Sequence, residues 1–213
     1  MSVKQICSAA LGAALCVYSV LALAGAYDDV IGAIKSDDAT AAAQLIRRGV
    51  EVETVDAQGN TLLMLAAREG SLRAVKMLCE MHARLDAANS LGETALMYAA
   101  LQGHLEVVRT LLAQGTAVDG NGWTPLIYAA VKGNLDVARL LLASGAKVNA
   151  AGPNGMTALI MAAREGHAEL AALLLKSGAN ADAQTDAGFT AFAIASKAQR
   201  ADVMAVLIKA GAR

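Results

Sequence analysis

The chain has 213 residues, a formal net charge of -1 and a hydrophobic content of 56%. A nearly neutral chain offers no strongly basic surface for phosphates, so we expect no nucleic-acid partner. It is long enough to bury a large core, and with only 3% aromatic residues that core must come mainly from Ala, Leu, Val, Ile and Met.

Residues 1–26 have the features of a secretory signal peptide. One Lys near the start is followed by an almost unbroken apolar stretch, which ends in the small residues Ala24-Gly25-Ala26. We expect cleavage after Ala26, with cleavage after Ala24 as the near alternative. An uncleaved membrane anchor is the rival interpretation, because the apolar stretch is almost long enough to span a bilayer. Cleavage predicts a periplasmic protein without membrane contact, and the absence of an Asn-x-Ser/Thr sequon in residues 27–213 favours a bacterial periplasm.

The cysteines exclude an intramolecular disulfide in the exported chain. Cys7 and Cys16 would leave with the signal peptide, so only Cys79 would remain. Its place in the repeat described next predicts a small buried hydrophobe rather than a nucleophile.

A ten-residue phrase recurs along the rest of the chain. It reads TPLIYAAVKG from Thr124, and its variants begin at Thr61, Thr94, Thr157 and Thr190, so the period is near 33 residues. A second phrase ends in Gly 21 residues after four of the five Thr residues, at Gly115, Gly145, Gly178 and Gly211, and Gly49 extends this register upstream. The sequence therefore predicts six units, which start near residues 27, 56, 89, 119, 152 and 185.

This period and the Thr-x-Leu-x-x-Ala-Ala-x-x-Gly pattern resemble the ankyrin repeat. The resemblance covers residues 27–213 and implies an all-α solenoid of about six helix-turn-helix units with short turn fingers before each Thr. Each Thr hydroxyl can cap its first helix, and a glycine such as Gly133 can end it in a left-handed conformation. Stacked units bury a continuous core, in which we expect Leu142 and Leu175.

Three departures from the repeat carry structural expectations. His82 stands where the terminal glycine of a unit is usual, which predicts backbone strain or a changed turn. Gln199 replaces glycine in the last unit, and such a departure is expected in an end unit because it exposes an outer face to water. The turn finger from Asp119 to Thr124 is three residues shorter than its neighbours. A shorter finger predicts a local flattening of the ridge that the fingers form.

The sequence contains no motif that predicts catalysis. There is no zinc-ligand spacing, phosphate-binding loop or nucleophile with a partner base. His104 and His167 occupy a Gly-His junction typical of the family, which predicts a structural role. We therefore expect no enzyme activity, no metal and no cofactor.

Partners of ankyrin proteins usually lie on the concave face made by the fingers and the exposed side of the first helices. The residues just before each Thr form a row that is polar at first and then apolar: Asn60, Glu93, Trp123, Met156 and Phe189. Stacking should leave this row exposed, and apolar anchors there favour a partner surface. The predicted partner-binding residues are Trp123, Met156, Phe189, Leu101, Val131, Glu93, Arg68 and Arg164. The alternative is that the apolar side chains only support neighbouring fingers and that the charged residues form a solvated rim.

Together these features predict a monomeric, exported, non-catalytic module that binds another periplasmic protein, such as an exported enzyme or a toxin. A small-ligand binder or enzyme with a pocket on the concave face is one alternative. A membrane-anchored scaffold is another, if the N-terminal segment is retained.

Overall fold

The computed structural model describes residues 25–120 and 122–211, and their regular structure is helical. The helices span residues 25–35, α2 (Ala39–Arg47), α3 (Leu62–Glu69), α4 (Leu72–Glu80), α5 (Ala95–Gln102), α6 (Leu105–Ala113), α7 (Pro125–Lys132), α8 (Leu135–Ala143), α9 (Ala158–Glu165), α10 (Ala168–Lys176), α11 (Ala191–Lys197) and α12 (Ala201–Lys209), with a 3-10 turn η1 (Pro153–Gly155). The expected signal peptide lies almost entirely outside the described residues. None of the described helices is long and apolar enough to cross a membrane.

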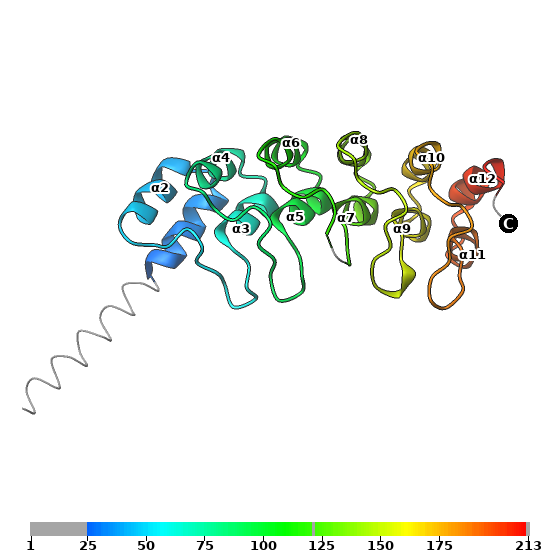
Figure 1. Ribbon diagram of the computed structural model, residues 1–213, viewed down its shortest axis with the longest axis horizontal. Coiled ribbons are helices and arrows are strands. Elements are labelled where there is room, and N and C mark those ends of the chain that lie inside the picture. Colours follow the sequence, from blue (N-terminus) through cyan, green and yellow to red (C-terminus); the bar gives the residue numbers. More distant parts are fainter. Residues whose placement is uncertain (1–24, 121, 212–213) are drawn as a thin grey trace, which may run out of the picture.

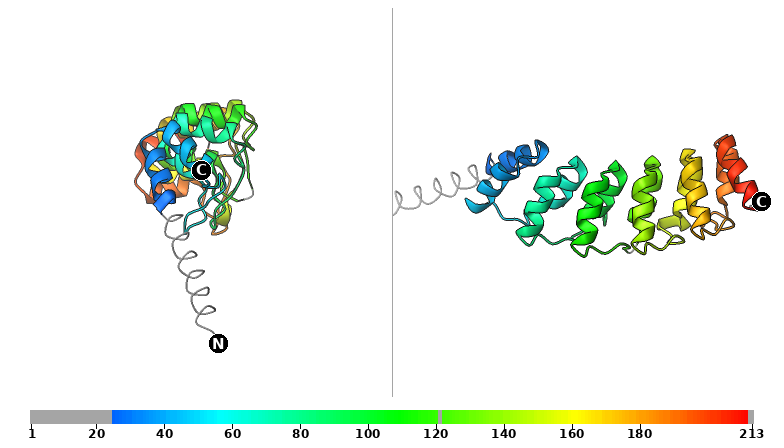
Figure 2. Two further views of the ribbon diagram at one scale, coloured as in Figure 1. Left: turned by 90° about the vertical axis from the view of Figure 1, so that its left-hand side faces the viewer. Right: turned by 90° about the horizontal axis from the view of Figure 1, so that it is seen from above.

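The helices form six antiparallel pairs stacked in one direction (Figure 1). First helices α3, α5, α7, α9 and α11 pack in one row, and second helices α4, α6, α8, α10 and α12 pack in another. The turn fingers project from the same edge of the stack, and both rows run its whole length (Figure 2). The predicted all-α stack of helix-turn-helix units is therefore confirmed.

The repeated Thr starts each first helix. In the five units that contain the phrase, the Thr hydroxyl accepts a hydrogen bond from the backbone N–H three residues later, as between Thr124 and Ile127 at 3.3 Å. This bond satisfies one of the donors that a helix start leaves free. Pro125 follows at the first helical position of α7, where its missing N–H costs nothing.

Glycine ends four of the first helices in the left-handed region, with φ of 71° at Gly133. The same turn is made without glycine by Gln199 in the last unit and by Asp37 in the first, at φ of 56° and 52°. His82, which replaces the terminal glycine of its own unit, has φ of 61°. The strain or changed turn predicted at His82 is confirmed as a left-handed backbone, whereas the sequence analysis did not predict this conformation at Gln199 or at Asp37.

The core is one continuous cluster of Leu, Ile, Val, Met and Ala that runs through all the units. In the second helices Leu141 and Leu174 are fully buried, whereas the expected core residues Leu142 and Leu175 are only partly buried. The expectation was wrong by one residue, because Leu141 and Leu174 lie on the face that turns toward the first helices. Cys79 is also only partly buried, and burial followed by the nearby Glu80 charge raises the pKa of its thiol.

A row of polar side chains links each unit to the one before it. The residue after the helix-ending position contacts a backbone carbonyl near the end of the preceding first helix. The pairs are Ser71 Oγ with Ile34 O (2.6 Å), His104 Nε2 with Arg68 O (3.1 Å), Asn134 Nδ2 with Leu101 O (2.9 Å), His167 Nε2 with Val131 O (3.3 Å) and Arg200 Nε with Arg164 O (3.3 Å). The structural role predicted for His104 and His167 is confirmed, and three other residue types perform it elsewhere.

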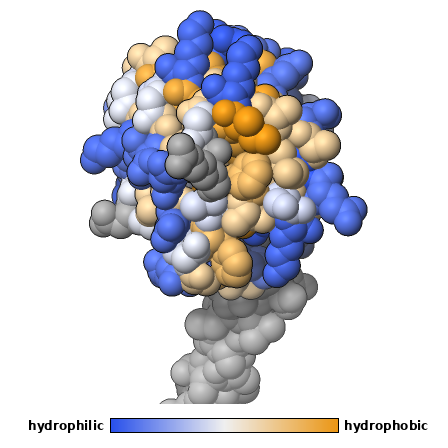
Figure 3. Space-filling model, turned by 90° about the vertical axis from the view of Figure 1, so that its right-hand side faces the viewer, coloured by the Kyte–Doolittle hydropathy of each residue, from blue (hydrophilic) through white to orange (hydrophobic). Residues whose placement is uncertain are grey.

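The end face of the sixth unit carries hydrophobic residues within a surround of polar ones (Figure 3). Ile208 of α12 is 59% exposed there. Ile208 holds the same register position in its unit as Leu142 and Leu175 hold in theirs. In those inner units the side chain at this position is partly buried against the core.

Candidate protein-binding face

A hydrogen-bond network centred on Glu93 occupies the finger side of the second, third and fourth units. One oxygen of Glu93 accepts from the Tyr98 hydroxyl at 2.7 Å, and the other accepts from the Tyr128 hydroxyl at 2.6 Å. Glu93 lies on the third finger, Tyr98 on α5 and Tyr128 on α7, so one carboxylate ties two neighbouring units together.

The same network reaches back into the second unit through two asparagines. Asn89 Nδ2 donates to Glu93 at 2.9 Å and lies 2.8 Å from Asn60 Oδ1. Asn60 Nδ2 in turn donates to Asp56 at 2.8 Å. Buried polar groups are stable only when they are hydrogen-bonded, and here each one has a partner.

The network shifts the pKa values of its members. Burial alone would raise the pKa of Glu93, but the hydrogen bonds from Tyr128, Asn89 and Tyr98 together outweigh burial and lower it. Burial and the hydrogen bond to Glu93 raise the pKa of Tyr98 to about 12 and also raise that of Tyr128. Glu93 is therefore held as a carboxylate and both tyrosines as neutral donors.

These contacts correct the expectation that the whole finger row is exposed. Asn60 is only 4% exposed, and Glu93 is half-buried with both oxygens engaged within the chain. The polar half of the row therefore joins fingers to each other, and the accessible part begins further along the stack.

Trp123 and Met156 are also half-buried and pack against the core. The Trp123 ring meets Tyr128 edge-on, with centroids 6.1 Å apart and planes at 67°. Its ring also lies beside Gly152 of the next finger, where an added Cβ would sit 3.5 Å from it. Trp123 thus supports its neighbours while one part of it stays accessible.

Phe189 is the most accessible predicted anchor, at 46% exposed. Lys197 of α11 places its ammonium group 5.8 Å from the centroid of the Phe189 ring, within the range of a cation–π contact. An exposed aromatic ring beside a cation is a common form of interface anchor.

The remaining predicted residues flank this row at the ends of the first helices. Arg68 pairs with Glu69 at 3.3 Å and Arg164 with Glu165 at 2.8 Å, both at the surface. Leu101 and Val131 are half-buried beside them. Exposed ion pairs of this kind contribute little to stability, so Arg68 and Arg164 lie on the face without stabilising its conformation.

Sequence reasoning missed Tyr98 and Tyr128, although a signal was present. Both occupy the fifth position of the repeated phrase, where the other units have Leu65, Met161 and Ile194. Two tyrosines at one register position, in the unit of the acidic Glu93 and in the unit that follows it, are a pattern that could have indicated the network.

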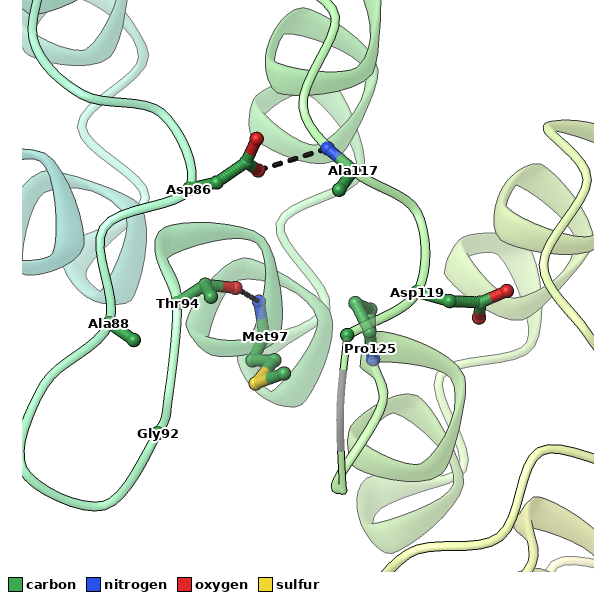
Figure 4. A pocket seen from close by; sticks show the side chains of 9 residues that line it. Asp86, Ala88, Gly92, Thr94, Met97, Ala117, Asp119 and Pro125 are labelled. Carbon is green, nitrogen blue, oxygen red and sulfur yellow. Dashed lines mark hydrogen bonds between the residues drawn. The ribbon is translucent and has the colours of Figure 1, made fainter.

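The face contains few features of a chemical site. In residues 25–120 and 122–211, no three His, Cys, Asp or Glu side chains lie close enough to hold a metal ion. A cavity of about 260 Å³ lies between the third and fourth fingers (Figure 4).

Comparison with known proteins agrees with this architecture. The family described as ankyrin repeats (3 copies) matches residues 30–119, 84–152 and 148–213. The chain belongs to the ankyrin-repeat family. A crystal structure of an ankyrin repeat domain from Acinetobacter baumannii AYE is similar, with 30% sequence identity, a TM-score of 0.74, and coverage of 86% of this chain and 98% of that one. No curated protein matches the sequence.

Ankyrin-repeat domains are generally protein-interaction scaffolds and are typically non-catalytic. The surface positions that vary between ankyrin units are therefore where a partner would be selected.

Proposed function

We propose that the chain is exported to the periplasm, where it binds another protein through the face formed by the fingers and the first helices. The observation that carries this proposal is Phe189, a large aromatic side chain that remains 46% exposed at the same register position as the half-buried Trp123 and Met156. Leu101 and Val131 extend the apolar strip. An exported enzyme or a toxin is the kind of partner that such a module would hold.

The binding works by a preorganised surface. The Glu93 network fixes the orientation of the second to fourth units, so a partner would not have to order these fingers on binding. Less conformational freedom is then lost in association, which strengthens binding without additional contacts.

The site can be tested by photo-crosslinking in a Gram-negative host. A photoreactive benzoylphenylalanine would replace Phe189 in one strain and Arg139, an exposed residue of α8, in a control strain. We expect a crosslinked partner from Phe189 and none from Arg139. Equal crosslinking from both positions, or from neither, contradicts the proposed face.

A substitution pair tests the same anchor by affinity. Phe189→Ala should weaken binding of the captured partner by more than tenfold if the ring is an anchor, since such truncations commonly cost about 2 kcal/mol or more. Ile208→Ala removes a similarly exposed apolar side chain from the end face and should leave binding unchanged.

The proposed export and signal-peptide cleavage can be tested separately from binding. Mass spectrometry of the protein recovered from the periplasm should show a chain that begins at Tyr27. A full-length chain found in the membrane fraction would favour the anchored scaffold instead.

A further inference from the structure

The sixth unit ends in a face against which no further described unit packs. Five of its side chains are less buried than their counterparts in the third, fourth and fifth units, where a following unit covers the same register positions. At the position of Phe192, for example, Leu126 and Leu159 are each only 1% exposed. These five residues define the end face of the sixth unit: Phe192, Ala193, Ser196, Met204 and Ile208. The end face therefore continues the surface by which the units of this stack pack against one another.

The end face is apolar, although terminal units of repeat proteins usually present a polar outer surface. Four of its five side chains are hydrocarbon or thioether, the fifth is the hydroxyl of Ser196, and none is charged. Figure 3 shows the hydrophobic residues at this end of the stack. The side chain of Ile208 is the most accessible of the large apolar ones, at 59% exposed. A contiguous apolar patch of this kind on a protein surface typically marks an interface.

The opposite end of the stack differs, because its outward positions carry charges. Asp29 is exposed at the register position where the next two units bury Leu62 and Ala95. The hollow that Asp29 lines on the first unit has four further polar side chains: Ser36, Asp38, Gln44 and Arg48. Head-to-tail stacking of two copies would bury the Asp29 carboxylate against the apolar end face, which is costly. Pairing of two end faces buries none of these charges.

Two exposed charges on α12 complement each other in such a pairing. Asp202 lies in the first turn of α12 and Lys209 in its last turn. Seven residues are about two helical turns, so both side chains lie along one line, beside the line of Met204 and Ile208. When two α12 helices meet in antiparallel orientation across a two-fold axis, Asp202 of each copy comes opposite Lys209 of the other. Neither charge forms an ion pair within the described part of the chain.

We propose that two copies of this chain associate through their end faces, with the two α12 helices antiparallel. This isologous contact uses the same residues on both copies, as in the most common type of protein dimer. The assembly closes after two copies, because both remaining ends are the polar first units. The dimer replaces the monomer expected from the sequence, and it does not depend on the proposed partner-binding function.

Sedimentation velocity over a range of concentrations tests the proposal. The protein purified from the expressing cells should shift from monomer to dimer between about 1 μM and about 1 mM, because one unit presents a small interface and small interfaces associate weakly. A monomer throughout this range overturns the proposal. Growth of the assembly beyond a dimer would indicate head-to-tail stacking and would overturn it too.

A matched pair of substitutions locates the interface. Ile208→Asp places a charge in the end face and should raise the dissociation constant of the dimer by more than tenfold. Leu91→Asp places the same charge at the tip of the third finger, where Leu91 is 78% exposed, and should leave the dissociation constant unchanged. Melts followed by circular dichroism show whether each variant keeps its fold. Association that persists in Ile208→Asp, or that is lost equally in Leu91→Asp, contradicts the assigned face.

An exchange of charges tests the antiparallel orientation. Asp202→Lys alone and Lys209→Asp alone should each raise the dissociation constant by about two- to tenfold, because two symmetry-related exposed ion pairs are lost. The double substitution places opposite charges across the two-fold axis again and should return the constant to near that of the parent chain. Both positions are exposed, so these variants remain decisive if Ile208→Asp fails to fold. A double variant as weak as the single ones overturns the proposal.

A photo-crosslink separates this contact from an interface with a different protein. Benzoylphenylalanine at Ile208 should join two copies of the chain. Capture of a different protein at this position, by a chain that sediments as a monomer, overturns the proposal and assigns the end face to that protein. None of these experiments uses a partner captured at Phe189, so failure of the proposed function leaves their outcomes unaffected.

Discussion

Adjacent residues of this stack differ in burial although the sequence alone does not distinguish them. Leu141 and Leu142 follow each other in α8, yet the first is fully buried and the second only partly. In the finger row, Trp123 and Phe189 hold the same register position, but only Phe189 is substantially exposed. The role of a residue is therefore decided by what the neighbouring unit places against it.

The two leucines of α8 give the first prediction. Leu141→Ala should lower the free energy of unfolding by about 2–5 kcal/mol, because it leaves a cavity in the continuous core. Leu142→Ala should cost clearly less, since part of that side chain already faces water. Urea denaturation followed by circular dichroism measures both, and equal losses would contradict the assigned burial.

Glu93 gives a prediction about pH. Its pKa is lower in the folded chain than in the unfolded one, so its ionised form contributes stability that is present above the unfolded pKa of about 4.3. That contribution is lost as the pH falls through the folded pKa. Glu93→Gln should therefore be less stable than the parent chain at pH 7, with a smaller difference near pH 3, as thermal melts across this range would show. A stability difference that does not change with pH would mean that the carboxylate charge is unimportant.

At the scale of the helix, residues at the two ends determine where each first helix begins and stops. Thr caps start the first helices, and a left-handed residue ends most of them, so each element carries its own boundaries in its sequence. The last unit departs from this pattern at Gln199, whose φ of 56° costs energy for a residue with a Cβ.

A pair of substitutions at equivalent helix ends tests this account. Gly133→Ala should destabilise the protein by at least 1 kcal/mol, because it combines a left-handed backbone with a Cβ only 2.5 Å from His167 Nδ1. Gln199→Gly should instead raise stability by up to about 1 kcal/mol. Differential scanning calorimetry should show melting temperatures that move in opposite directions, and a gain from Gly133→Ala would refute the stated cause.

At the scale of the whole molecule, the stack is held together by contacts between neighbouring units. Each first helix packs against the second helix of its own unit and against the first helices of adjacent units, and the junction side chains each reach one unit back. Stability should then depend on how many neighbours a unit has. The units at the ends of the described stack have one neighbour, whereas the inner units have two, and the second to fourth units also share the Glu93 network.

Hydrogen exchange provides the corresponding measurement. Backbone amides of α5 and α7 should be the best protected, and those of α2 and α12 should exchange faster by at least tenfold. Mass spectrometry of peptic fragments resolves these segments. Uniform protection along the stack would indicate a single cooperative unit instead.

The sequence by itself determined the fold, the number of units and their helix boundaries, because caps, glycines and the period of near 33 residues are local signals that recur in register. It also located the short fourth finger and the structural role of His104 and His167. The family match agrees with the fold.

Only the tertiary structure decided which side chains of the finger row face solvent. Asn60 and Glu93 are drawn inward because Tyr98 and Tyr128, from two different helices, converge on one carboxylate. The cavity between the third and fourth fingers likewise exists only because residues of two stacked units line it. Such contacts join residues about 30 positions apart in the chain, and no local pattern specifies them until the units are stacked.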